Sequence, residues 1–452
     1  MTPQQYRRRS ILGLGAMASL GALGWARDSE TQVLPGGYRA LVCIFLNGGN
    51  DGNNTLIPLD GGYKDYVRTR RSLGLADSEL IKLPGTPNGR LFGLHPACAE
   101  LASLYGQQKL AFIANIGALI RPTTAAQVLN HQADLPTALF SHSDQIDVLQ
   151  GWQGTEEHSG WAGRALEAKN LSIGDAIKGI TNNMASMFVR GQTYSPAYLS
   201  IDEGNQSWGA ASLVDSKDPL YQAIKQVASI KPNANPYLAE YSRTLNATLD
   251  QSAELARAVA LAKEPATAFG SSELDLRLRY LAKLLPVFKQ AGYQQQVFII
   301  DWGSFDTHND QRGSNNLTQD SQLLVVSKAM GAFQTALDLA GMADNVTTFM
   351  MTEFSRTLMP ATSNGSDHAW GNHFWVMGGR VRGGTVYGQY PDLVLGGKDD
   401  CDEEKEGRFV PTIATDQYGA TLLNWLGISP QGIARAFPNL GNFAVRDLGF
   451  MV

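Results

Sequence analysis

Two imidazoles and one carboxylate fall close together near residue 370, in a chain that has only 7 histidines. They belong to Asp367, His368 and His373. Neutral imidazole nitrogens and carboxylate oxygens are common ligands of divalent cations. This spacing therefore predicts a metal site, and the alternative is a turn in which the imidazoles cap backbone groups and pack against Trp370.

Further candidate ligands follow apolar runs that are expected to be buried strands. These runs cover residues 40–46, 296–301 and 346–352. In an open parallel sheet, ligands bind beyond the carboxyl ends of the strands. Polar side chains at these ends are therefore expected to share one polar or metal site. They are Asp51 after the first run, Asp306 and His308 after the second, and Glu353 after the third, followed by Asp367, His368 and His373.

The elements that would position these residues alternate between strand and helix patterns. A helix over 95–106 precedes another apolar run at 110–115, and long helical stretches precede the later runs. Strands that are apolar throughout and separated by helices are typical of a mostly parallel sheet covered on both faces. The sequence therefore predicts an α/β fold with a mostly parallel central sheet.

Two segments depart from this alternation. Residues 170–235 are irregular and rich in Ser, Gly and Asn, which predicts a loop-rich insertion. Residues 398–406 carry six acidic side chains among nine. A calcium loop is one interpretation of this run, but EF-hand spacing is missing, and a solvated surface loop is the alternative that charge runs favour.

The N-terminus predicts export. Arg8 and Arg9 precede a polar residue and a short Gly-, Ala- and Leu-rich run, which is typical of a twin-arginine signal over residues 1–26. The expected partner is the twin-arginine translocase, and the expected location is periplasmic or extracellular. A general secretory signal is the alternative and implies the same compartment. No later apolar run is long enough to span a membrane, so the mature chain is expected to have no transmembrane segment.

The rest of the chain is expected to form one domain over residues 38–450. Its composition is that of a globular protein, with 43% hydrophobic and 17% charged residues. A net charge of -5 argues against nucleic acid as a partner. Cys43, Cys98 and Cys401 lie far apart, so they allow at most one disulfide and no thiolate zinc site.

Four blocks carry a resemblance to a known family: residues 45–58, 305–308, 352–357 and 367–373. They resemble the domain-of-unknown-function 1501 family over essentially the whole chain after the signal. That family is exported by bacteria and placed in the alkaline phosphatase and sulfatase superfamily. The resemblance implies a three-layer alkaline-phosphatase-like fold and hydrolysis of phosphate or sulfate esters, with a small molecule or glycan as substrate. It also implies one or two divalent metal ions, with Zn, Mn, Mg and Ca as candidates.

The resemblance also implies catalytic residues. In that superfamily the nucleophile opens a helix, and in sulfatases a glycine follows ten positions later, as Gly151 follows Ser141 here. A helix N-terminus stabilises an anionic ester oxygen. The alternative for Ser141 is a simple N-cap. His142 and Asp144 flank Ser141 and are weaker candidates. Arg356 would oppose the charge that develops on the ester, or would pair with a carboxylate such as Glu353.

Two other functions remain open because the chain departs from superfamily enzymes. His308 follows Asp306 by two positions instead of four, Phe354 takes the place of a histidine, and the sulfatase Cys-x-Pro-x-Arg motif does not occur. One alternative is a degenerate, non-catalytic member that binds a glycan or a partner protein. The other is a serine hydrolase that uses Ser141 with His142 or His308, which the missing Gly-x-Ser-x-Gly elbow disfavours.

Overall fold

A parallel sheet is the centre of the computed structural model. Strands β1 (Arg39–Leu46), β8 (Gln295–Trp302) and β9 (Val346–Met351) are its middle, with β8 and β9 on either side of β1. The residues that the structure describes are 37–86, 89–151, 158–168, 179–183, 185–198, 217–229 and 235–452. The predicted signal over residues 1–26 lies outside them, so export stays a prediction.

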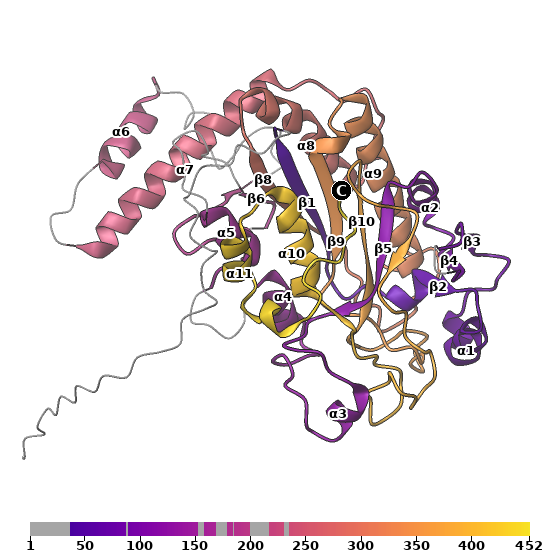
Figure 1. The fold of residues 1–452 in the computed structure, drawn as a ribbon. Helices are drawn as coiled ribbons and strands as arrows, with labels where there is room; N and C mark the ends of the chain where they lie inside the picture. The colour runs from indigo at the N-terminus through magenta and orange to yellow at the C-terminus, as the bar shows by residue number, and fades with distance from the viewer. Residues whose placement is uncertain are drawn as a thin grey trace, which may run out of the picture. The chain divides into compact units, whose positions relative to one another are not determined.

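Within the described residues, the sheet has nine strands in the order β11-β5-β10-β9-β1-β8-β6-β7, with β12 paired to β5 (Figure 1). Every pairing is parallel except those of β10 (Asn372–Gly378), which runs antiparallel to β5 and β9. The four apolar runs singled out in the sequence are confirmed as strands. The remaining strands of this sheet are β5 (Leu110–Gly117), β6 (Gly179–Thr181), β7 (Ala197–Tyr198), β11 (Val386–Tyr387) and β12 (Ile413–Ala414).

Helices cover both faces of the sheet, as predicted. Phe298 of β8 packs against Phe288 of α8 (Glu273–Gln290). Phe349 of β9 pairs one position out of step with Phe298 and packs against Tyr418 of α10 (Thr415–Leu426). Since adjacent strand positions point to opposite faces, α8 and α10 lie on opposite sides. The fold is therefore a three-layer α/β sandwich (Figure 1).

The other helices lie around these layers. The α-helices are α1 (Tyr63–Arg70), α2 (Ala99–Gly106), α3 (Ala125–Leu129), α4 (His142–Gln150), α5 (Trp161–Glu167), α6 (Pro219–Ala228), α7 (Pro236–Leu261), α9 (Gln319–Leu339) and α11 (Pro430–Ala436). Short 3-10 helices are η1 (Gly52–Asn54), η2 (Arg71–Leu73), η4 (Ala343–Asn345) and η5 (Pro438–Asn442). A small second sheet contains β2 (Leu56–Pro58), β4 (Phe92–Leu94) and β3 (Ile81–Lys82).

The segment that was expected to be a loop-rich insertion contains regular elements. Strands β6 and β7 extend the central sheet beyond β8, and α6 follows them. Residues 169–178, 184, 199–216 and 230–234 of this region lie outside the described part of the chain. The predicted boundaries of the insertion therefore stay a prediction.

The acidic run at 398–406 is held by the protein itself. Asp400 is buried, and its carboxylate accepts hydrogen bonds from the backbone N–H groups of Gly396, Asp402 and Arg408. The Asp402 carboxylate pairs with the Arg408 guanidinium at 2.7 Å. These protein donors satisfy the carboxylates of Asp400 and Asp402, so neither needs a calcium ion as a partner.

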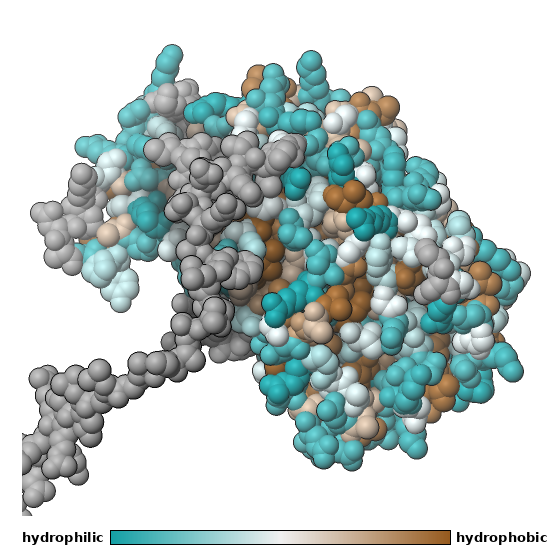
Figure 2. Space-filling view, viewed as in Figure 1, coloured by the Kyte–Doolittle hydropathy of each residue, from teal (hydrophilic) through white to brown (hydrophobic). Residues whose placement is uncertain are grey.

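The surface and the cysteines follow the composition. Figure 2 shows mostly hydrophilic residues on the visible face, with hydrophobic ones in scattered spots. Across the described residues, none of the helices combines the length and the apolarity that a membrane crossing requires. Cys43, Cys98 and Cys401 are all free and buried, so the single disulfide that the sequence allowed does not form among them.

Candidate metal centre

Three imidazoles converge on one carboxylate at the carboxyl edge of the sheet. Asp306 and His308 come from the loop after β8, His368 comes from the loop before β10, and His142 is the first residue of α4. The distances from Asp306 Oδ1 to the three Nε2 atoms are 3.3 Å for His142, 3.0 Å for His308 and 3.4 Å for His368. Residues from three distant parts of the chain therefore form one cluster, which we call the histidine centre.

Hydrogen bonds at the Nδ1 atoms of His142 and His368 orient their imidazole rings. His142 donates its Nδ1–H to Glu353 Oε1 at 2.8 Å, and His368 donates its Nδ1–H to the Phe140 carbonyl at 2.7 Å. The Nδ1 of His308 faces Asp367 Oδ1 at 3.7 Å. A neutral imidazole whose Nδ1 carries the proton has its lone pair on Nε2. This tautomer turns the Nε2 lone pairs of His142 and His368 toward Asp306, the arrangement in which histidine binds metals.

The ligand atoms of His142, Asp306 and His368 lie within 4.8 Å of one another, close enough to hold one metal ion. Ligands about 2.0 Å from a tetrahedral zinc lie roughly 3.3 Å from one another. The Nε2 atoms of His308 and His368 are 3.0 Å apart, and the three separations from Asp306 Oδ1 are similar. Among the described atoms, His142 Nε2 is buried and has no hydrogen-bond partner. Imidazole nitrogens and a carboxylate oxygen at these spacings are a suitable ligand set for a divalent cation.

The electrostatics keep Asp306 and His368 in ligand form at neutral pH, whereas they favour the protonated form of His142. Burial acts to raise the pKa of Asp306, but the hydrogen bond and charge of Arg356, with His142 and His308 nearby, lower it to about 2. The hydrogen bond to Glu353 raises the pKa of His142. Burial, together with the positive charges around it, lowers the pKa of His368. Asp306 is therefore ionised and His368 neutral.

Arg356 binds the Asp306 carboxylate of the histidine centre. Its guanidinium is fully buried and donates hydrogen bonds to the Asp306 carboxylate and to the carbonyls of Gly48, Gly49 and Ser366. The carboxylate that it pairs with is therefore Asp306 and not Glu353. Because the guanidinium is buried and bonds these four acceptors, it orients Asp306. The Arg356 guanidinium is not directed toward solvent.

Glu353 is not one of the residues that form the histidine centre. It is buried, and its Oε1 accepts hydrogen bonds from His142 Nδ1 and from the Gly48 N–H at 2.7 Å. Its Oε2 accepts one from the Thr352 hydroxyl at 3.1 Å. Glu353 thus orients His142. Asp367 lies at the rim with a half-exposed side chain, and it forms a second ligand-like group with His308 and His368.

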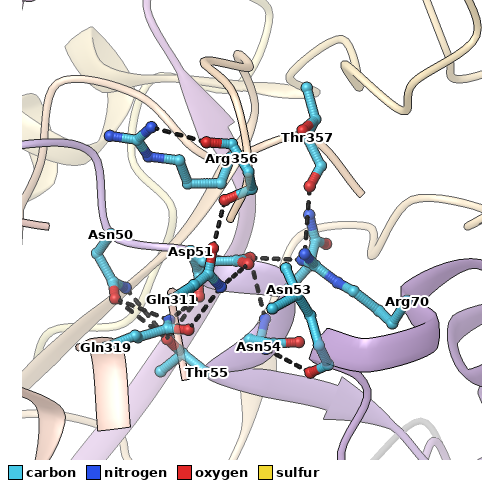
Figure 3. A network of polar contacts seen from close by, with 12 residues as sticks. Asn50, Asp51, Asn53, Asn54, Thr55, Arg70, Gln311, Gln319, Arg356 and Thr357 are labelled. Carbon is cyan, nitrogen blue, oxygen red and sulfur yellow. Dashed lines mark hydrogen bonds and ion pairs between the residues drawn. The ribbon is translucent and has the colours of Figure 1, made fainter. Parts of the chain in front are cut away.

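Asp51 is separate from the histidine centre. Its Oδ1 pairs with Arg70 at 2.6 Å and caps η1 by accepting the Asn54 N–H, and its Oδ2 accepts a hydrogen bond from Gln311 at 2.8 Å (Figure 3). The side chains of Asp51 and Arg70 are both fully buried. An arginine therefore takes the position at which the sequence predicted that Asp51 would contact a metal.

His373 is also separate, because it lies in β10. Its Nδ1 accepts the Asn115 N–H at 3.1 Å, so its Nε2–H faces Asn53 Oδ1 at 3.3 Å, and its ring stacks on Tyr390. Burial lowers the pKa of His373 to about 3. Of the two histidines between which the sequence could not choose, His368 is in the histidine centre and His373 is in the core.

The buried His373 predicts a specific loss of stability in acid. Its folded pKa of about 3 lies below the ordinary value of about 6.5. Between these values the unfolded chain binds a proton that the folded chain does not, so stability falls as the pH is lowered from about 6.5 toward 3. A His373→Phe variant is expected to lose less unfolding free energy between pH 7 and pH 4.5 than the wild type, as urea titrations measure. Equal losses in both proteins contradict the assignment.

Ser141 occupies the N-cap of α4, directly before His142. Its Oγ donates a hydrogen bond to Asp144 Oδ2 at 2.5 Å, and within the described residues it makes no capping bond to the helix backbone. Gly151 ends the helix in a left-handed conformation with φ 118°. The predicted helix from Ser141 to Gly151 is confirmed, and its N-terminus adjoins the histidine centre through His142 and Phe140.

From the sequence, His142 is only a weak candidate for the site, although the structure places it in the histidine centre. It was only a neighbour of Ser141, because its partners Glu353 and Asp306 lie far away in the chain. The one local signal is its place at the start of a helix, directly after the candidate nucleophile.

The fold and the centre define an α/β protein with a histidine-rich candidate metal site at the carboxyl ends of its central strands. The chain belongs to the family described as "Protein of unknown function (DUF1501)", whose model matches residues 38–401. No curated protein matches the chain.

Solved structures with low similarity include hydrolases. The PsFucS1 sulfatase from Pseudoalteromonas sp. is 9% identical, with a TM-score of 0.34 over 87% of this chain and 68% of that one. A protein in the alkaline phosphatase superfamily from Vibrio parahaemolyticus is 11% identical, with a TM-score of 0.35 over 87% and 67%. The phosphonate monoester hydrolase of Agrobacterium radiobacter is 10% identical, with a TM-score of 0.31 over 87% and 74%. All three TM-scores are below 0.5, so these likenesses do not establish the function of this chain.

Proposed function

We propose that the protein is an exported, metal-dependent hydrolase of phosphate or sulfate esters. The observation that supports it best is the convergence of three imidazole Nε2 atoms on Asp306 Oδ1, directly beside the N-terminus of α4. The ester substrate is a small molecule or a glycan. This proposal extends the resemblance that the sequence carries, using the geometry of this chain.

The residues that would hold the metal are His142, Asp306, His308 and His368. A set dominated by imidazole favours zinc over magnesium or calcium, which prefer oxygen ligands. A bound divalent cation would lower the pKa of a nearby hydroxyl or water and offset the charge of the ester. Glu353, Arg356 and the Phe140 carbonyl keep the four ligands in place through the hydrogen bonds described above.

Ser141 is the proposed nucleophile. Its hydroxyl proton is directed to Asp144, which is placed to accept it as Ser141 Oγ attacks the ester. The Oγ bond to phosphorus or sulfur forms while the bond to the leaving alcohol oxygen breaks, and that oxygen takes up a proton from solvent. Water then attacks the phosphorus or sulfur and loses a proton to solvent. The bond to Oγ breaks, and Oγ recovers its proton from Asp144 as phosphate or sulfate leaves. The N-terminal amides of α4 stabilise negative charge on the ester oxygens. Arg356 acts on Asp306 and is a positioning residue in this scheme.

Elemental analysis of the folded protein, followed by assays on aryl phosphate and aryl sulfate esters, tests the proposal. Bound zinc and hydrolysis of one ester class support it. Bound metal without hydrolysis of any ester points to the non-catalytic binding member that the sequence left open. A folded protein that binds no divalent metal and hydrolyses no ester contradicts the proposal.

Replacing Ser141 with alanine is expected to lower kcat by at least roughly a hundredfold while metal content stays unchanged, since the variant loses the nucleophile. Steady-state assays on the best ester, with metal analysis of the same preparation, measure both. Ser143→Ala is the matched control, because Ser143 is an exposed serine on the same helix turn, 3.3 Å from Ser141 Oγ. Equal activity of the two variants contradicts the role of Ser141.

Export through the twin-arginine translocase is part of the proposal and rests on Arg8 and Arg9. Cell fractionation of a variant with both residues changed to lysine tests it. Retention of that variant in the cytoplasm, with export of the wild type, is the expected result. Export of both proteins contradicts the twin-arginine route and leaves a general secretory signal.

A further inference from the structure

One buried amide joins the loops that carry the ligands. Gln311 is fully buried, and its Nε2 donates hydrogen bonds to Asp51 Oδ2 at 2.8 Å and to Gln319 Oε1 at 3.0 Å (Figure 3). Its Oε1 accepts hydrogen bonds from the hydroxyls of Thr307, at 3.2 Å, and Ser366. A glutamine side chain can donate two hydrogen bonds and accept two. Gln311 therefore uses its full capacity.

Asp51 fixes which way this amide points. The Asp51 carboxylate, which pairs with Arg70 at 2.6 Å, offers only acceptor oxygens to its neighbours. The Nε2 of Gln311 must therefore face Asp51, and Oε1 must face the two hydroxyls. The reverse orientation would place an amide oxygen against a carboxylate, which low-dielectric surroundings make costly.

The two hydroxyls belong to the two ligand loops. Thr307 lies between Asp306 and His308, and Ser366 lies two positions before His368. The loops also touch directly, since the Ser366 N–H donates to the Thr307 carbonyl at 3.0 Å. A Cβ on Gly365 would lie 2.1 Å from the His308 backbone, so these loops are in close backbone contact. The Gln311 side chain is the polar bridge beneath that contact.

We propose that Gln311, oriented by Asp51, is a positioning residue that sets the distance between the Asp306–His308 loop and the His368 loop. This inference rests on the proposed metal binding, which it deepens. Asp51, which the sequence predicted as a ligand, thus acts on the ligand loops indirectly. It orients Gln311, and Gln311 bonds Thr307 and Ser366. The spacing of Nε2 and Oδ1 donors determines how well they hold a cation, so the bridge controls metal affinity.

Gln311→Met keeps the length of the side chain and removes all four hydrogen bonds. Its zinc dissociation constant, measured by competition with a chromophoric chelator, is expected to rise by roughly tenfold or more. The visible absorption spectrum of the Co²⁺-loaded variant is expected to differ from that of the wild type. Gln334→Met is the matched control, because Gln334 is a buried glutamine on α9 that bonds Asp338 at 3.0 Å. Its affinity and spectrum should be unchanged.

Ser366→Ala removes one hydroxyl donor to Gln311 and gives a milder change in the same direction. If Gln311→Met does not fold, the zinc dissociation constant and the Co²⁺ spectrum of Ser366→Ala test the inference instead. Wild-type affinity and an unaltered Co²⁺ spectrum in these variants overturn the inference while leaving the proposed function intact. A wild-type protein that binds neither zinc nor cobalt overturns both.

Discussion

Replacing His368 with alanine is expected to strip the metal from the protein, whereas replacing His373 with phenylalanine is expected to leave it bound. His368 directs its Nε2 at Asp306 from 3.4 Å, while both ring nitrogens of His373 face backbone and amide groups in the core. Loss of a direct ligand should weaken zinc binding by more than roughly a hundredfold, beyond the effect of an outer contact. Elemental analysis and chelator competition measure this, and ester hydrolysis should fall to background with the metal.

Phenylalanine is chosen at position 373 because it preserves the ring that stacks on Tyr390. Both variants are compared per folded molecule, with circular dichroism as the check on folding. If His373→Phe loses the metal and His368→Ala retains it, the histidine centre is assigned to the wrong histidine. Equal retention in both variants argues against a site formed by His142, Asp306 and His308 together with His368.

Replacing Arg70 with methionine is expected to lower the free energy of unfolding by about 3–5 kcal/mol, the usual cost of leaving a buried charge unpaired. Arg70 and Asp51 are 2.6 Å apart with fully buried side chains, and Arg70 also donates to the Thr357 carbonyl at 3.2 Å. Without Arg70, the Asp51 carboxylate keeps its hydrogen bonds from Gln311 and Asn54 but has lost its counterion. Urea denaturation measures the change.

Arg68→Met is the matched control on the same helix. Arg68 is 67% exposed and pairs with Asp65 one turn away, so its loss should cost less than about 1 kcal/mol. A double variant, Arg70→Met with Asp51→Asn, should recover part of the stability, because it removes the unpaired charge. If the double variant is as unstable as Arg70→Met, the loss comes from packing and not from charge.

The sheet was predictable because its central strands are buried on both faces. Strands β1, β8 and β9 therefore appear in the sequence as continuous apolar runs. The same logic predicted Asp306 and His308 at the edge where the parallel strands end, whereas His368 reaches this edge from the loop before the antiparallel strand β10. Strand β10 was the exception, since its antiparallel direction depends on pairings that no local pattern encodes.

The differences between the predicted and the observed surroundings of the candidate site residues have one physical cause. Whether a polar side chain faces a metal or the core depends on its partners, and these partners come from elsewhere in the chain. Asp51 meets Arg70, His373 meets Asn115 and Tyr390, and His142 meets Glu353. Residue type and spacing cannot reveal these pairings. Asp51 and His373 were therefore ranked too high as candidate ligands, and His142 was ranked too low.

The distance along the chain between the ligands has a consequence for assembly. His142 precedes the loop after β8, and His368 comes later still, 62 residues beyond Asp306. A nascent chain that ends before His368 has already made β1, β8 and β9, yet it lacks a ligand. If the proposed site binds a metal, capture by the full ligand set would require the chain to be made at least as far as His368, after the segments of β1, β8 and β9. For a protein that the twin-arginine route would carry across the membrane after folding, loading would belong to the cytoplasm.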